Sequence, residues 1–172
     1  MQNPKQEIEH VFGLLTQAHT ATVQAEALNR FYTYDAAFRH PLCTVPSAPG
    51  SRKEILGIYR WYRIMSPTIQ GDVETIAYDE ENSIIYLEVV QKFHIWLSPL
   101  PVHPARLIVR LRLRKDGDLW YVCEQEDFYH PEDLLALVLP PLIWPARLAL
   151  RIGAISSNVL AEASRAAFGW WR

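Results

Sequence analysis

Apolar residues recur at helical spacing in the first third of the chain. Behind Pro4, which suits the first turn of a helix, Ile8, Val11 and Leu15 fall on one helix face. Before the third apolar stretch, Ser51 and Glu54 have the spacing of a capping box. The pattern predicts helices over residues 4–20, 22–32 and 52–65, with an extended segment around Phe38.

From Ile69 the period of the pattern changes from 3.6 to 2, which is typical of strands. Strands are predicted over residues 69–79, 84–97, 105–114 and 119–129, and helices over 131–139 and 145–168. Helices followed by an antiparallel meander indicate an α+β domain, with the helices over one face of a curved sheet. We expect a cone-shaped domain over residues 1–139 and an apolar helical extension over 140–172.

The register of the last hairpin decides which face carries two carboxylates. Strand 105–114 alternates arginines with aliphatic residues, so its aliphatic face must meet the core. If Asp116-Gly117 closes a two-residue turn, Glu124 and Glu126 lie on the apolar face. If a three-residue turn with a bulge closes it, both glutamates lie opposite the arginines as surface ion pairs. The pattern leaves both registers open.

A carboxyl group in an apolar cavity has a raised pKa and can act as a general acid or base near neutral pH. In the first register Glu126 is therefore a candidate catalytic residue, with Glu124 beside it. His40 either reaches the mouth of the pocket as the partner of Glu126 or is a structural histidine held by a neighbouring loop.

Four further residues are predicted to bind substrate. Gln91 stands on an otherwise apolar strand face, and Phe93 follows on the same face. Tyr59 and Tyr62 lie on the third helix as pocket or core aromatics. Gln91 and Tyr62 are candidate hydrogen-bond donors to a developing oxyanion. A strand-edge amide bonded to backbone or water is the alternative interpretation of Gln91.

Composition argues against several classes of function. The chain has 172 residues and a formal net charge of −2, which provides no strong attraction for nucleic acid. The six histidines and two cysteines show no spacing typical of a metal site, and no glycine-rich nucleotide motif occurs. We therefore expect no metal and no cofactor. The first residues lack the pattern of a signal peptide, so a cytoplasmic location is expected.

The extension over residues 140–172 is apolar but interrupted. Its prolines, together with Arg147 and Arg151, argue against a membrane-spanning helix, which needs about twenty predominantly apolar residues. Tryptophans and arginines on one amphipathic helix suit the surface of a membrane. Packing against the sheet or against a second subunit, as in a homodimer, is the alternative.

Three segments resemble a known family. Residues 35–43, 51–67 and 125–131 are similar to the SigF-like branch of the nuclear transport factor 2-like superfamily, which includes SnoaL-like cyclases and ketosteroid isomerase-like enzymes. The likeness extends over residues 8 to 165. It implies a cone-shaped α+β barrel whose cavity lies between a curved sheet and the first three helices. Related folds catalyse isomerisation, cyclisation or dehydration without a cofactor.

Together these features predict a protein with a pocket for an apolar small molecule. The first hypothesis is a cofactor-independent isomerase, cyclase or lyase of secondary metabolism that uses acid and base residues in the cone. The alternative is a non-catalytic module that binds a hydrophobic ligand or lipid and is tethered to a membrane or a partner by its C-terminal helix.

Overall fold

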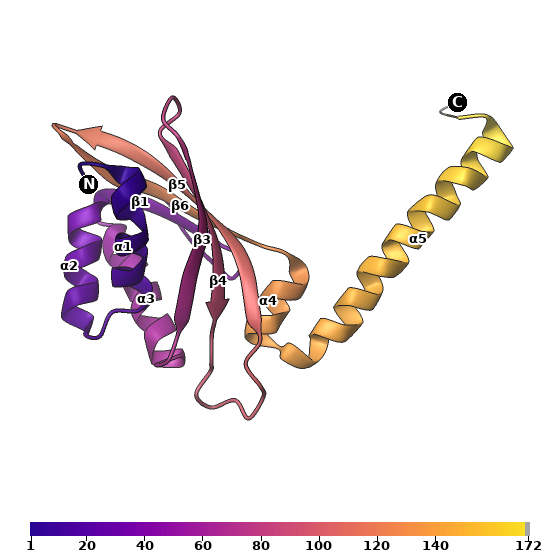
Figure 1. Ribbon diagram of the computed structural model, residues 1–172, viewed down its shortest axis with the longest axis horizontal. Helices are drawn as coiled ribbons and strands as arrows, with labels where there is room; N and C mark the ends of the chain where they lie inside the picture. Colours follow the sequence, from indigo (N-terminus) through magenta and orange to yellow (C-terminus); the bar gives the residue numbers. More distant parts are fainter. Residues whose placement is uncertain (171–172) are drawn as a thin grey trace.

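The computed structural model describes residues 1–170 as a helix-covered sheet with a long helix leading away from it (Figure 1). The helices of the domain are α1 (Pro4–Thr16), α2 (Ala21–Phe31), α3 (Arg52–Met65) and α4 (Pro131–Val138). The strands are β1 (Tyr32–His40), β2 (Cys43–Val45), β3 (Gln70–Asp79), β4 (Ile84–Lys92), β5 (Pro104–Asp116) and β6 (Leu119–Tyr129). A 3-10 turn, η1 (Pro140–Leu142), connects α4 to α5 (Ile143–Phe168).

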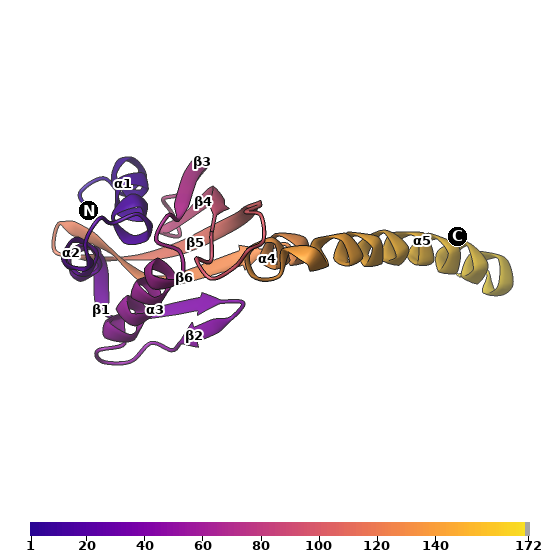
Figure 2. The same cartoon turned by 90° about the horizontal axis from the view of Figure 1, so that it is seen from below.

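The six strands form one curved sheet in the order β2-β1-β6-β5-β4-β3. β1 pairs with β6 in parallel, and every other neighbouring pair is antiparallel. Helices α1, α2 and α3 cover one face of the sheet (Figures 1 and 2). The predicted α+β class is confirmed, although the sheet stays open between its edge strands β2 and β3 and does not close into a barrel.

The core lies between the helices and the inner face of the sheet. Every second residue of β5 is buried, from Ala105 to Leu113, while the arginines between them face outward. Ile8 and Leu28 from the helices pack into the same cluster as these aliphatic side chains. The alternation in the sequence therefore predicted the inner face of β5 correctly.

Several predicted boundaries differ from the structure. The first helix ends at Thr16, four residues before the predicted end. The second predicted strand, over residues 84–97, ends at Lys92, and residues 93–103 form the loop that precedes β5. The capping box was wrong, because the Ser51 hydroxyl donates to the carbonyl of Ala36 and makes no cap bond to α3. The Ser51 hydroxyl therefore connects the start of α3 to β1 and does not cap the helix.

One extra residue interrupts the pairing between β5 and β6. Asp116 pairs with Leu119, so Gly117 and Asp118 form a two-residue turn. The pairing then changes register, because Cys123 has no partner across the ladder. The Cys123 thiol donates to the carbonyl of Arg112, 3.3 Å away. This is a β-bulge, and one added residue exchanges the two faces of the strand beyond it.

Beyond the bulge, the odd-numbered residues of β6 face the core in place of the even-numbered ones. Gln125 pairs with Leu111, and Asp127 pairs with Val109, both of which are buried aliphatic positions of β5. Gln125 and Asp127 are themselves buried. The bulge therefore places an amide and a carboxyl group on the inner face of the sheet.

Gly71, at the start of β3, lies close to the Phe12 ring of α1, and this contact can be tested. A methyl group there would lie 3.1 Å from the Phe12 ring, whereas nothing lies within 4 Å of the corresponding position at Gly13 in α1. Gly71→Ala is expected to lower the free energy of unfolding by about 1–2 kcal/mol through overpacking. Gly13→Ala is expected to raise it by about 0.5–1 kcal/mol, because alanine favours the helix. Urea unfolding measures both, and equal effects of the two variants would contradict the prediction.

Candidate functional site

A cavity opens between the inner face of the sheet, α1, α3 and α4. The volume of this cavity that the centres of water molecules can occupy is about 90 Å³. This is enough for several waters. Its wall is mainly aromatic and aliphatic, with few polar groups. The lining residues used below are His40, Leu42, Tyr59, Tyr62, Gln91, Phe93, Gln125, Asp127, Tyr129, Leu134, Leu137 and Val138.

Two tyrosines and an amide hold Asp127 in place. The hydroxyl groups of Tyr32 and Tyr59 donate to Gln125 Oε1, at 2.5 and 2.8 Å. Gln125 Nε2 donates to Asp127 Oδ1 at 2.9 Å. Because both tyrosines donate to the oxygen of Gln125, its amide nitrogen must point towards Asp127. No hydrogen bond joins the second carboxylate oxygen, Oδ2, to a residue in 1–170, and the side chain lines the cavity.

Burial raises the pKa of Asp127 to about 7. Removal of the carboxyl group from water is the main cause, and the negative charge of Glu126 raises the pKa further. The hydrogen bond from Gln125 acts in the opposite direction because it stabilises the carboxylate. A carboxyl group of this pKa exchanges protons readily near neutral pH, which is what a general base requires.

His40 lines the cavity as a neutral side chain. Its Nδ1 accepts the backbone N–H of Leu42 at 3.2 Å, so the ring hydrogen of the neutral form is on Nε2. Burial lowers the pKa of His40 to about 4. The ring lies against Tyr129 and Tyr62, with centroid distances of 5.2 and 5.8 Å. At neutral pH His40 is therefore a hydrogen-bond donor and not a proton acceptor.

The four predicted substrate-binding residues also line the cavity. Tyr59, Tyr62, Gln91 and Phe93 all contribute to its wall. Gln91 Oε1 accepts a hydrogen bond from the Tyr129 hydroxyl at 3.3 Å, which places its partner within the cavity wall. Burial raises the pKa of the Tyr62 hydroxyl, so this group keeps its proton. Their binding role stays a prediction.

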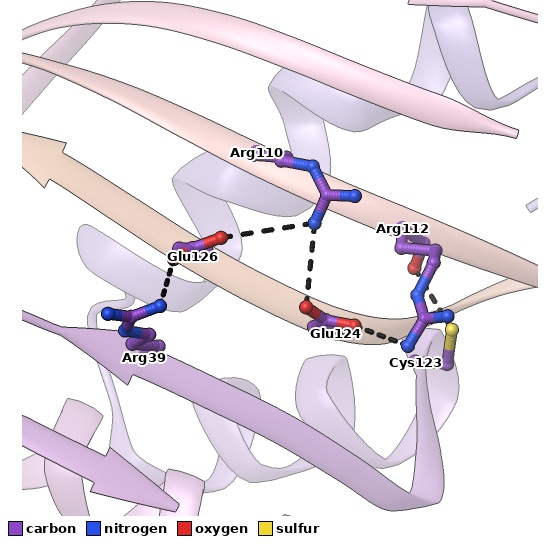
Figure 3. Close-up of polar contacts among 6 residues, drawn as sticks. All are labelled: Arg39, Arg110, Arg112, Cys123, Glu124 and Glu126. Carbon is purple, nitrogen blue, oxygen red and sulfur yellow. Dashed lines mark hydrogen bonds and ion pairs between the residues drawn. The ribbon is translucent and has the colours of Figure 1, made fainter. Parts of the chain in front are cut away.

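Glu124 and Glu126 lie on the opposite face of the sheet, as in the second of the two registers that the pattern left open (Figure 3). This placement corrects their predicted catalytic role in the cavity. Arg39 pairs with Glu126 at 2.9 Å, and Arg110 lies 3.5 Å from Glu124 and 4.0 Å from Glu126. Arg112 also pairs with Glu124. The physical reason is the bulge, which turns both glutamates towards the arginines of β5 and β1. Neither carboxylate lines the cavity, and neither is retained here as its acid or base.

Asp127 and Gln125 are the polar residues that the sequence analysis missed. The second register considered for this hairpin turns the two glutamates outward, and the same parity turns Gln125 and Asp127 inward. That signal was present in the segment Gln125-Glu126-Asp127.

One cluster among residues 1–170 has ligand types suited to a metal ion. His130, Glu132 and Asp133 lie together at the start of α4. Glu132 already pairs with Arg147 at 3.3 Å, and Asp133 accepts the backbone N–H of Arg106. None of the three lines the cavity, and the contacts of Glu132 and Asp133 connect α4 to α5 and β5.

Gln125→Leu tests the network that holds Asp127. The variant leaves two buried tyrosine hydroxyl groups without their acceptor, so the free energy of unfolding is expected to fall by about 2 kcal/mol. Loss of the donor to Asp127 is expected to raise the pKa of that carboxyl above about 7. Titration of the aspartate carbon by NMR measures the pKa. Glu126→Gln is the matched control, since removing its charge should lower the pKa of Asp127, and a shift in the same direction for both variants would contradict the network.

A comparison with protein families shows to which family this chain belongs. The family model described as the SigF NTF2-like domain matches residues 1–170. The chain belongs to this family. The match includes the cone and most of the C-terminal extension, and the division at residues 139 and 140 stays a prediction. A comparison with curated proteins finds no match.

Three of the solved structures that share this fold come from bacteria. A candidate SnoaL-like polyketide cyclase from Jannaschia sp. CCS1 is 14% identical, with a TM-score of 0.58, over 81% of this chain and 97% of that one. A candidate isomerase of the SnoaL-like family from Agrobacterium tumefaciens is 10% identical, with a TM-score of 0.56, over 73% and 97%. A ketosteroid isomerase-like protein from Catenulispora acidiphila, solved with trimethylamine, is 15% identical, with a TM-score of 0.55, over 74% and 90%. These likenesses establish the fold of this SigF NTF2-like protein.

Proposed function

We propose that this protein is an enzyme that moves a proton on a small, mostly apolar molecule, with Asp127 as the general base. The observation that carries the proposal is a single buried carboxyl group on an apolar cavity wall, with a pKa of about 7 and one oxygen free of hydrogen bonds to residues 1–170. The candidate cyclase and isomerase of the same fold add support by analogy.

The proposed step transfers a proton from carbon to Asp127. Oδ2 of the carboxylate accepts a proton from a carbon next to a carbonyl group. The electron pair of the broken C–H bond forms a C=C bond, and the π electron pair of the carbonyl group moves onto its oxygen. His40 Nε2–H and the Tyr62 hydroxyl are the neutral donors that would stabilise the resulting oxyanion. Asp127 then returns the proton to a second carbon, which completes an isomerisation. For a cyclisation, the carbanion instead attacks a second carbonyl carbon, and Asp127 returns its proton to the alkoxide that this attack forms.

The experiment that tests this proposal starts from the ligand. Native mass spectrometry of protein purified from its own cells identifies any small molecule that stays bound. That molecule is then incubated with the protein in D2O, and deuterium uptake at carbon is measured. Enzymatic proton transfer predicts uptake above the background rate at a defined carbon. Binding of a single compound with no uptake and no conversion would overturn the enzymatic proposal and support a non-catalytic binding module.

A second proposed role concerns the C-terminal helix. α5 has no buried residue along its 26 positions, and many of its large apolar side chains are exposed. We propose that this helix tethers the domain to a surface outside the domain, as expected from the amphipathic pattern of residues 140–172. Among residues 1–170, no helix has both the length and the apolar character needed to cross a bilayer.

A further inference from the structure

α5 leaves the domain without packing against it. In both views the helix extends away from the sheet and from α1, α2 and α3 (Figures 1 and 2). Its main contacts are with α4 and η1 at its first turns. A helix in water gains little stability from propensity alone, and most helices in proteins depend on burial of an apolar face. α5 therefore presents an apolar face that residues 1–170 leave uncovered.

That face is a continuous stripe on one side of the helix. At 100° per residue, five large apolar side chains fall within an arc of about 80°. The stripe consists of Trp144, Leu148, Ile152, Ile155 and Val159. All five are exposed, and Trp144 retains 76% of its accessible surface. Leu150, also exposed, points about 160° away from the centre of the stripe.

The charge of α5 differs in sign from that of the whole chain. The helix carries Arg147, Arg151 and Arg165 against the single acid Glu162, a net charge of +2, whereas the chain has −2. On the helix projection the three arginines lie together along one border of the apolar stripe. Arg147 pairs with Glu132, and Arg165 pairs with Glu162. No such ion pair joins Arg151 to any of residues 1–170.

We propose that α5 lies flat on a bilayer that contains anionic lipids, with the stripe at the boundary between headgroups and acyl chains. This inference rests on the proposed tethering role of α5 and specifies the surface to which the helix binds. An apolar stripe with tryptophan, bordered by arginines, matches a surface that is apolar within and negative at its headgroups. A second copy of α5 fits less well, because pairing would bring six arginines together with only two glutamates.

This placement has a consequence for the ligand. Leu134, Leu137 and Val138 of α4 line the cavity, and α4 leads through η1 directly into α5. Val138 and Leu42 both line the cavity and are exposed, at 39% and 60%, so the cavity reaches the surface beside α4. With α5 on a bilayer, this opening is held close to the lipid. The ligand class is therefore a compound that partitions into bilayers.

Vesicle flotation of the full chain tests the inference. The vesicles are phosphatidylcholine alone and phosphatidylcholine with 30% phosphatidylglycerol, each at low and at high salt. Binding to the anionic vesicles is expected to be at least tenfold stronger, and high salt should reduce the difference. Arg151→Gln should weaken binding to anionic vesicles about fivefold and leave binding to neutral vesicles unchanged.

A matched pair of leucines separates the stripe from general hydrophobicity. Leu148→Asn, on the stripe, is expected to weaken binding about tenfold. Leu150→Asn replaces a leucine of similar exposure, 41% against 49%, on the other side of the helix and should change binding less than twofold. Both positions are exposed, so neither variant threatens the fold of the domain.

The outcomes separate this inference from the proposals on which it rests. Equal loss for the two leucine variants, or equal binding to neutral and anionic vesicles, would overturn the anionic bilayer while leaving a tether possible. Absence of binding to either vesicle, together with a dimer by light scattering, would overturn the membrane surface altogether. Deuterium exchange by Asp127 is measured separately in solution and is independent of all these results.

Discussion

Replacing Asp127 by asparagine is expected to slow proton transfer by at least about 100-fold, with the fold intact. Asparagine has nearly the same shape and can still accept the hydrogen bond from Gln125 through its oxygen, so the network is preserved. What it loses is the carboxylate that accepts the proton. Deuterium exchange into the co-purifying ligand measures the rate, and tyrosine and tryptophan fluorescence checks the fold.

Glu126→Gln is the control for this experiment. Glu126 is the neighbouring residue on β6, but it lies on the outer face and pairs with Arg39. This variant should retain the wild-type rate within about threefold. A loss for Glu126→Gln with an active Asp127→Asn would place the chemistry on the outer face and contradict the proposed site.

The pH profile supplies a second readout. A general base with a pKa of about 7 acts only when ionised, so the rate is expected to rise with pH up to about 7 and to level above it. His40, with its pKa near 4, stays neutral through this range and adds no second step. A rate that does not change between pH 5 and 8 would exclude Asp127 as the base.

The second large effect concerns stability. The pKa of Asp127 is raised from 3.8 to about 7, so the folded state holds this proton more tightly than the unfolded state. Its contribution to stability is complete below pH 3.8 and is lost as pH rises towards 7. At 1.36 kcal/mol per pKa unit, the loss is on the order of 4 kcal/mol. Asp127→Asn removes this cost, so its stability relative to wild type should increase by about that amount between pH 4 and 8.

His40 contributes the opposite dependence on pH. Its pKa is lowered from 6.5 to about 4, so its contribution is complete above pH 6.5 and is lost as pH falls towards 4. Between these values the two groups oppose each other in the wild type. His40→Asn should therefore gain stability relative to wild type on acidification from pH 6.5 to 4, by about 3 kcal/mol.

Urea unfolding at pH values from 4 to 8 measures both trends. Each variant also carries a constant offset from altered packing, so the test is the change of the difference with pH and not its size at one pH. Parallel curves for wild type and Asp127→Asn would contradict the raised pKa. Such a result would also remove the physical basis for Asp127 as a base near neutral pH.

The sequence alone determined most of the local structure and the walls of the cavity. The apolar spacing predicted α3 over residues 52–65 and the strand over 119–129 with the bounds that the structure has. It also indicated Tyr59, Tyr62, Gln91 and Phe93 as candidate substrate-binding residues. All four line the cavity, and their binding role stays a prediction. The predictions of local structure succeed because side chains alternate in a strand and recur at 3.6 residues in a helix, which depends only on nearby residues.

Only the tertiary structure decided which carboxyl group reaches the cavity. A bulge at Cys123 is set by the pairing of β6 with β5 on one side and with β1 on the other, and not by the pattern within residues 119–129. With the bulge, Arg110 lies opposite Glu126, and Asp127 lies opposite Val109. Without it, the glutamates would face the core. The faces of a strand alternate with every residue. One unpaired residue therefore places Glu126 on the outer face, where it forms ion pairs, and Asp127 on the inner face, where it lines the cavity.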